Sequence, residues 1–140
     1  MDWPTFWKFY KLEYGNHDFW NQIVMSKPLN LKQLDIIYEW VSKIWIARHQ
    51  TLSERWIRKH KEDIELKWCC IYQHLSEEFI REFQDELNWT AVSINQHLSE
   101  KFIEEMRDKV NWMFIFDNQT LTQKFKDKHS DKMRKTVNHV

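Results

Sequence analysis

A 23-residue repeat is the feature that most constrains the fold of this 140-residue chain. Two segments nearly repeat one another, YQHLSEEFIREFQDELNW at residues 72–89 and NQHLSEKFIEEMRDKVNW at residues 95–112. The same step returns a Gln, a Leu and an aromatic residue at Gln50, Gln73, Gln96 and Gln119, at Leu29, Leu52, Leu75, Leu98 and Leu121, and at Trp56, Phe79, Phe102 and Phe125. Two similar helices alone do not produce that many registers of one period, so the period belongs to the fold.

Each repeat predicts two helices. The second helix begins after a residue whose side chain can accept hydrogen bonds from the free N–H groups of a first helical turn; these residues are Asn30, Ser53, Ser76, Ser99 and Thr122. An apolar stripe typical of an amphipathic helix follows, for example Phe79, Ile80, Phe83 and Leu87. The first helix is short and carries a small residue, at Ala47, Cys70 and Ser93, where backbones come close.

A two-turn helix cannot bury its apolar face alone, so each repeat must pack on the next. We therefore predict an all-α fold, a short α-solenoid of about five 23-residue helix-turn-helix units. One domain is expected over residues 1–140, with an N-terminal cap at 1–19, repeats at 20–134 and a tail at 135–140. The cap is an aromatic helix that begins near Pro4 and plugs the first repeat. His129 replaces the Phe83 and Met106 of earlier repeats, which predicts a polar end that faces solvent.

The composition limits the classes of function. Lys plus Arg and Asp plus Glu both number 21, so the formal net charge is zero, which argues against a general nucleic-acid binder and against a nucleic-acid mimic. Cys69 and Cys70 are adjacent, which is unfavourable for a mutual disulfide, and we interpret them as reduced packing residues of an intracellular protein. The N-terminus has no signal-peptide pattern and no apolar run approaches the roughly 20 residues of a membrane span, so a cytoplasmic protein without a membrane association is expected.

The wording of the repeat resembles a helical repeat that reads roughly NWxxISxxQxLSExFIxEF, found in proteins of large DNA viruses and of bacteriophages of Gram-positive bacteria. The segment Asp85 to Trp112 carries the closest match, and residues 20–134 follow it with decreasing fidelity. Lys43 stands where the pattern has Trp, and Lys27 stands where it has Gln. The resemblance implies a viral, phage or prophage origin and a scaffold with no catalytic residues to carry over.

No catalytic or metal-binding motif appears. His74 and His97 share one repeat position, but zinc needs three or four converging ligands and the equivalent positions hold Pro28, Thr51 and Thr120. His60 lies in the buried stripe, where a hydrogen-bonded, half-buried histidine is expected. A single glycine, Gly15, excludes a glycine-rich phosphate loop. We therefore expect no enzyme activity and no cofactor or metal.

Candidate binding residues are outward-facing positions that vary between repeats. The position two residues after the first Trp of a repeat holds Gln22, Trp45, Trp68, Ala91 and Phe114. Trp, Tyr and Arg are enriched at binding hot spots, so the predicted partner-binding set is Trp45, Trp68, Phe114, Tyr72, Arg48 and Trp40. The alternative is that the short helix is rotated and that Trp45 and Trp68 pack between repeats.

These observations favour a small non-enzymatic viral protein that binds a host protein or complex. Steric inhibition of a host defence, for example of a nuclease complex in the manner of an anti-CRISPR, is the best-motivated form. The first alternative is a structural virion component, such as a minor capsid or cement protein. The second is a nucleic-acid-binding accessory protein that uses a basic tail, which holds Lys124, Lys126, Lys128, Lys132, Arg134 and Lys135 against Asp127 and Asp131. A solvated terminal helix with a frayed end is the favoured interpretation of the tail, so this alternative is less favoured.

Overall fold

The computed structural model describes the backbone of residues 1–137 and the side chains of residues 1–133. Within this part of the chain, twelve α-helices and one 3₁₀ helix form and no strand is present, which confirms the predicted all-α class. The chain divides into two compact halves, an N-terminal half from Met1 to Gln73 and a C-terminal half from His74 to Val140. The expectation of one repeat domain over residues 1–140 stays a prediction.

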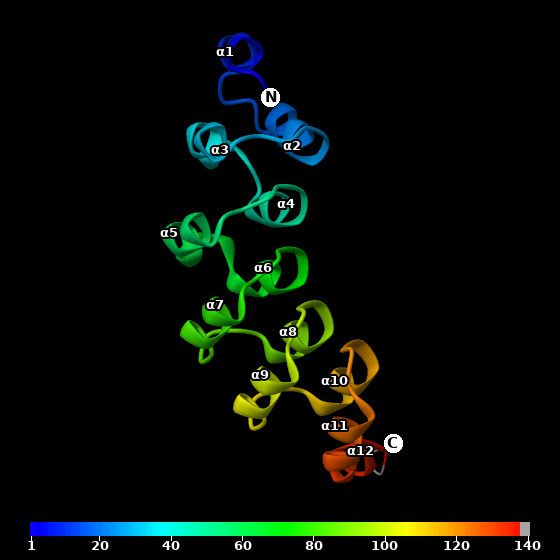
Figure 1. The fold of residues 1–140 in the computed structure, drawn as a ribbon. Helices are drawn as coiled ribbons and strands as arrows, with labels where there is room; N and C mark the ends of the chain where they lie inside the picture. Colours follow the sequence, from blue (N-terminus) through cyan, green and yellow to red (C-terminus); the bar gives the residue numbers. More distant parts are fainter. Residues whose placement is uncertain (138–140) are drawn as a thin grey trace. The chain divides into compact units, whose positions relative to one another are not determined.

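The N-terminal half contains six α-helices and the 3₁₀ helix η1. Their bounds are α1 Trp3–Leu12, α2 His17–Ser26, α3 Leu31–Ile37, η1 Tyr38–Trp40, α4 Lys43–His49, α5 Glu54–Ile64 and α6 Leu66–Tyr72. Helix α4 packs against α2 on one side and against α6 on the other (Figure 1). Helix α1 covers α2, because the fully buried ring of Phe6 on α1 lies 5.5 Å from the ring of Trp20 on α2. The predicted N-terminal aromatic cap is therefore observed within this half.

The C-terminal half contains the other six α-helices. Their bounds are α7 Glu77–Glu82, α8 Trp89–Asn95, α9 Glu100–Glu105, α10 Trp112–Asn118, α11 Gln123–Lys128 and α12 Ser130–Val137. Helix α10 packs between α8 and α12, so it has the same role here that α4 has in the N-terminal half (Figure 1).

The predicted helix caps are confirmed. Each side chain accepts a hydrogen bond from the backbone N–H three residues further on, and this holds for Asn30, Ser53, Ser76, Ser99 and Thr122. At Asn30 the bond is reciprocal, because the Gln33 side chain accepts from the Asn30 N–H and closes a capping box. Because of these caps, the second helix of each repeat begins at the same position of the repeat.

The repeated glutamine joins one repeat to the one before it. In the N-terminal half, the Gln73 amide nitrogen donates to the Ala47 and Gln50 carbonyls at 2.6 and 2.7 Å, and its oxygen accepts from the Leu52 N–H at 3.0 Å. Gln50 makes the matching bonds to the Val24 and Lys27 carbonyls and from the Leu29 N–H. In the C-terminal half, Gln119 makes them to Ser93 and Gln96 and from Leu98. The glutamine thus satisfies backbone groups that a helix end and a turn leave open.

A second repeated bond involves the Trp of the motif in two repeats and the Lys that replaces it in another. The indole N–H of Trp89 donates to the Gln84 carbonyl at 2.8 Å, and that of Trp112 donates to the Arg107 carbonyl at 3.0 Å, in each case five residues earlier. Lys43 occupies the same register, and its ammonium group donates to the Tyr38 carbonyl, also five residues earlier. Lys43 therefore replaces the indole as a donor, although burial lowers the pKa of its ammonium group.

The small-residue position is buried as predicted. Ala47, Cys70 and Ser93 are fully buried, and Cys69 is fully buried beside Cys70, with neither cysteine in a disulfide. Burial raises the pKa of the Cys69 thiol to about 12, so this thiol is protonated at neutral pH and is a poor nucleophile. The packing interpretation of the cysteine pair is confirmed.

The expectation that His129 faces solvent is wrong. Its side chain is buried, with 4% of the residue exposed, and its ring lies 4.6 Å from the rings of both Trp112 and Phe125. Its Nε2 lies 2.5 Å from Glu104 Oε1. The carboxylate gives the imidazole a polar partner, so a histidine can take the place of an apolar residue.

Candidate functional site

Four of the six predicted partner-binding residues lie together on α4 and α6. Trp45 and Arg48 belong to α4, and Trp68 and Tyr72 belong to α6. The Arg48 guanidinium carbon lies 5.9 Å from the centre of the Trp45 ring and 5.6 Å from the centre of the Tyr72 ring, so one cation bridges the two helices. The Trp68 and Tyr72 rings are stacked, with centres 6.4 Å apart and planes 16° apart.

Two further residues that the sequence did not single out complete this cluster. The His49 ring centre lies 5.6 Å from that of Trp45, and the Lys67 ammonium group lies 4.6 Å from the Trp68 ring centre. We call Trp45, Arg48, His49, Lys67, Trp68 and Tyr72 the α4–α6 surface. Helical spacing was a usable signal for His49, which lies one turn after Trp45. Lys67 had none, because a residue adjacent in sequence to Trp68 normally points elsewhere on a helix.

The sequence left open whether Trp45 and Trp68 face outward or pack between repeats, and their observed exposure is intermediate between the two. Arg48, His49, Lys67 and Tyr72 are exposed, Tyr72 by 40%, whereas Trp45 and Trp68 are half-buried. The indoles are therefore neither fully packed between repeats nor fully outward. Arg48 and Lys67 lie 5.9 and 4.6 Å from the centres of the Trp45 and Trp68 rings, so an exposed cation stands beside each half-buried indole.

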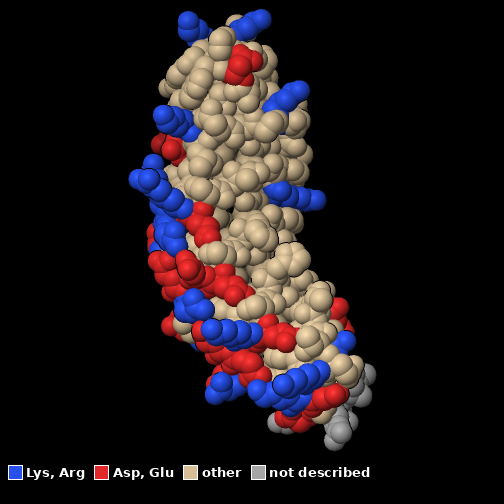
Figure 2. Space-filling view, in the orientation of Figure 1, with Lys and Arg blue, Asp and Glu red and all other residues tan. Residues whose placement is uncertain are grey.

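The charge of this surface is of one sign. Helices α4 and α6 carry Lys43, Arg48 and Lys67 and contain no Asp or Glu. Over the α4 and α6 side of the N-terminal half, the surface in Figure 2 is tan with blue groups and without red, while the opposite edge carries both colours.

Trp40 lies in a different cluster of the N-terminal half, and Phe114 belongs to the C-terminal half. The Trp40 ring lies 5.5, 4.8 and 6.5 Å from the rings of Tyr10, Tyr14 and Trp20, so it belongs to the aromatic cluster under the N-terminal cap. Phe114 is half-buried on α10 of the C-terminal half.

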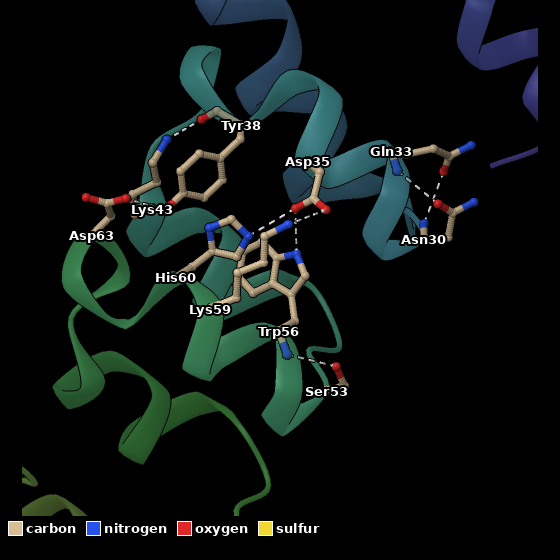
Figure 3. A network of polar contacts seen from close by, with 10 residues as sticks. All are labelled: Asn30, Gln33, Asp35, Tyr38, Lys43, Ser53, Trp56, Lys59, His60 and Asp63. Carbon is tan, nitrogen blue, oxygen red and sulfur yellow. Dashed lines mark hydrogen bonds and ion pairs between the residues drawn. The ribbon is translucent and has the colours of Figure 1, made fainter. Parts of the chain in front are cut away.

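A polar network on α3 and α5 is the second candidate (Figure 3). Asp35 Oδ1 accepts from the Trp56 indole at 2.9 Å and lies 3.1 Å from His60 Nε2, and the Lys59 ammonium group lies 3.6 Å from its other oxygen. The His60 ring packs against the rings of both Trp56 and Tyr38, at 4.1 and 4.5 Å. The expected half-buried, hydrogen-bonded histidine is confirmed.

The same network includes a phenol that is not poised for chemistry. The Tyr38 hydroxyl donates to Asp63 at 3.3 Å, and burial, with the nearby Asp63 charge, raises the pKa of Tyr38 to about 12. A phenol with a raised pKa stays protonated at neutral pH and acts as a donor. Among the described residues, the hydrogen bonds of the Asp35–His60 pair involve the Trp56 indole and no hydroxyl or thiol.

The C-terminal half contains a counterpart three repeat steps further along. Asp35 and His60 correspond in register to Glu104 and His129, and Trp56 corresponds to Phe125. Glu104 also pairs with Lys128 at 2.8 Å, and hydrogen bonds from Lys128 and His129 lower the pKa of Glu104 to about 2. A stacked histidine with a carboxylate from the preceding repeat is thus a recurrent way to hold two repeats together.

The other histidines form no metal site in the described part of the chain. The rings of His74 and His97 come within 5.9 Å of each other, as their shared register suggested, but no group of three or more His, Cys, Asp or Glu side chains converges among the described residues. Of the basic tail, Arg134 and Lys135 lie outside the residues whose side chains are described.

Comparisons with models of protein families, with curated protein sequences and with solved structures found no match to this chain. Among the residues that the structure describes, no helix has both the length and the apolar character needed to cross a bilayer.

Proposed function

We propose that this chain is a small non-enzymatic binding protein that attaches to a partner protein through the α4–α6 surface. The observation that carries the proposal is the clustering of Trp45, Arg48, Trp68 and Tyr72 on two adjacent helices, in contact with one another and accessible. Trp, Tyr and Arg supply most of the energy at protein interfaces, because large rings bury area with few rotatable bonds and guanidinium groups bond in several directions.

The scaffold for this surface is, in our proposal, a short α-solenoid of about five 23-residue repeats. Recurring caps, glutamine bonds and carboxylate–histidine pairs within each half support it. Solenoids present binding residues on one helix of successive repeats while the core positions stay the same. A block of a partner site needs about 800 Å² per protein, which a solenoid of this length can present.

The resemblance of the repeat to those of DNA viruses and phages supports a viral role in the host cytoplasm. The proposed action is occupation of a host protein surface, with interference with a host defence such as a nuclease complex as its best-motivated form. Neither the polar network nor the buried thiols offer a nucleophile with a base, which supports binding without catalysis.

Affinity purification of the tagged protein from host lysate, with identification and reconstitution of the captured protein, tests this proposal. The Trp45→Ala/Trp68→Ala variant should lose the partner while its circular dichroism spectrum remains that of the wild type. The matched control is Ile94→Ala/Met113→Ala, which removes two exposed apolar side chains from α8 and α10 and should retain the partner.

Three results would redirect the proposal. Retention of the same partner by the tryptophan variant would show that the α4–α6 surface is not the site. Fixed copy numbers in purified particles, with no captured host protein, would favour the virion role. Binding to nucleic acid with a steep dependence on salt would favour the basic-tail role.

A further inference from the structure

The cations of the α4–α6 surface differ from paired cations elsewhere in the structure. Arg81 pairs with Glu105 at 2.6 Å, Lys109 with Asp85 at 2.8 Å and Lys128 with Glu104 at 2.8 Å. Arg48 and Lys67 instead lie over aromatic rings, and within the described residues neither has a carboxylate inside 4.0 Å. The surface therefore has two exposed positive groups that form no ion pair with a described carboxylate.

The rings hold these cations in place before any partner arrives. Arg48 contacts Trp45 on its own helix and Tyr72 on the neighbouring helix, which restricts the rotamers of a side chain that is otherwise flexible. A preordered guanidinium group loses less conformational entropy when it binds, and its planar fork matches a carboxylate in two parallel hydrogen bonds. A neutral partner would cover the same charges without pairing them, at a desolvation cost. Charge complementarity thus selects an anionic partner.

The arrangement favours carboxylates over the phosphates of nucleic acid. Single-stranded nucleic acid binds through open ring faces on which bases stack and through many phosphate contacts. Here the three aromatic rings already carry Arg48 or Lys67, and α4 and α6 supply only these two exposed cations beside His49. A few carboxylates next to an apolar side chain match this surface better than a phosphate backbone does.

We propose that the α4–α6 surface binds an acidic segment of the partner protein, whose carboxylates pair with Arg48 and Lys67 while an adjacent apolar side chain packs on Tyr72 and Trp45. The inference rests on the proposed function and adds the chemistry of the partner to it. Rim charges mainly raise association rates and fix orientation, so the interaction is salt-dependent.

Fluorescence anisotropy with a labelled peptide of repeated Glu-Glu-Leu sequence tests the inference on the full chain. The wild type should bind the peptide, and Arg48→Gln/Lys67→Gln should weaken it about tenfold, a loss of about 1.4 kcal/mol. The control Lys32→Gln/Lys101→Gln removes two exposed lysines of α3 and α9, and so the same charge, and should leave the affinity within about twofold.

Absence of peptide binding would overturn the inference, as would an equal loss in the control, which indicates attraction by net charge alone. Tighter binding of oligothymidine with the same dependence on Arg48 and Lys67 would overturn it in favour of nucleic acid. The two proposals fail separately. A captured partner that is lost with Trp45→Ala/Trp68→Ala but kept with Arg48→Gln/Lys67→Gln contradicts only the acidic partner. A partner kept by both variants contradicts the proposed function as well.

Discussion

The α4–α6 pair of the N-terminal half and the α8–α10 pair of the C-terminal half occupy the same register and carry different chemistry. Two repeat steps relate two sets of equivalent positions, Trp45, Arg48, His49, Lys67, Trp68 and Tyr72 in the first and Ala91, Ile94, Asn95, Met113, Phe114 and Asn118 in the second. The expectation that Ala91 faces outward is wrong, because it is buried, with 8% exposed. The first set combines cations with rings, whereas the second has no charge and only one ring. One scaffold therefore presents two different surfaces.

The polar residues of the second pair face their own helices. The Asn95 side chain donates to the Ala91 carbonyl and the Asn118 side chain to the Phe114 carbonyl, both at 3.0 Å. Their counterparts His49 and Tyr72 contact rings of the α4–α6 surface instead. The positions that join helices are the same in both halves and the positions of these two sets differ, as the proposed binding role of the α4–α6 surface requires.

The largest expected effect comes from breaking the scaffold that the two pairs share. Gln73→Ala removes a buried side chain with three backbone bonds and should lower the free energy of unfolding by about 3 kcal/mol, because the abandoned groups cannot all reach water. Gln119→Ala breaks the matching bonds at a half-buried position, where water replaces them, and should cost about 1 kcal/mol. Urea denaturation measures both, and equal losses would contradict this account of burial.

The carboxylate–histidine pair of the C-terminal half should make stability depend on acid. The pKa of Glu104 falls from 4.5 to about 2 on folding, so its contribution is complete above pH 4.5 and disappears as the pH falls toward 2. Because 29% of the side chain is exposed, we expect about 1–2 kcal/mol. Glu104→Gln should lose this amount at neutral pH and show a flatter acid profile in thermal melts between pH 2 and 5. The exposed Asp117→Asn is the control, and an acid profile that Glu104→Gln leaves unchanged would contradict the assignment.

The start of α6 carries a strain that the start of α10 lacks. Glu65 precedes α6 with φ 56° and ψ 105°, while its counterpart Asn111 precedes α10 with φ −88°. A positive φ costs a residue with a Cβ roughly 1–2 kcal/mol, whereas glycine adopts it freely. Glu65→Gly should therefore raise the free energy of unfolding by about 1 kcal/mol after the greater entropy of the unfolded glycine chain is included. Asn111→Gly should lower it, and stabilisation by both substitutions in urea denaturation would contradict the strain argument.

The features that could be predicted from the sequence are those that depend on residues close to one another in the chain. Caps such as Ser76 and small core residues such as Cys70 depend on their own repeat, so period and residue type identify them. Contacts between repeats were harder to predict from the sequence. The glutamine was visible as a register, but its carbonyl acceptors lie 23 and 26 residues earlier, and no local pattern assigns them.

The partners of His129 and Arg48 also lie in another repeat, so the local sequence did not identify them. His129 looked like a solvent-facing substitution because its carboxylate partner stands in the preceding repeat. Arg48 was a candidate from its residue type, but its position over Tyr72 depends on how α4 packs against α6. Residue type and period therefore locate candidate surfaces, and the packing of successive repeats decides which side chains meet.

The smallest expected effect is also the most direct comparison of the two helix pairs. In a chain already carrying Arg48→Ile/Lys67→Met, which copies the residues of the second pair, Ile94→Arg/Met113→Lys moves the two cations to α8 and α10. The affinity for the Glu-Glu-Leu peptide should rise about threefold, which is less than the loss caused by removing Arg48 and Lys67. The reason is that Phe114 supplies one ring where α4 and α6 supply three. Adding Asn118→Tyr should increase the gain, since a tyrosine there stands in the register of Tyr72 and can hold the new arginine. Full recovery by the cations alone, measured by anisotropy, would show that the rings of the α4–α6 surface do not contribute to binding.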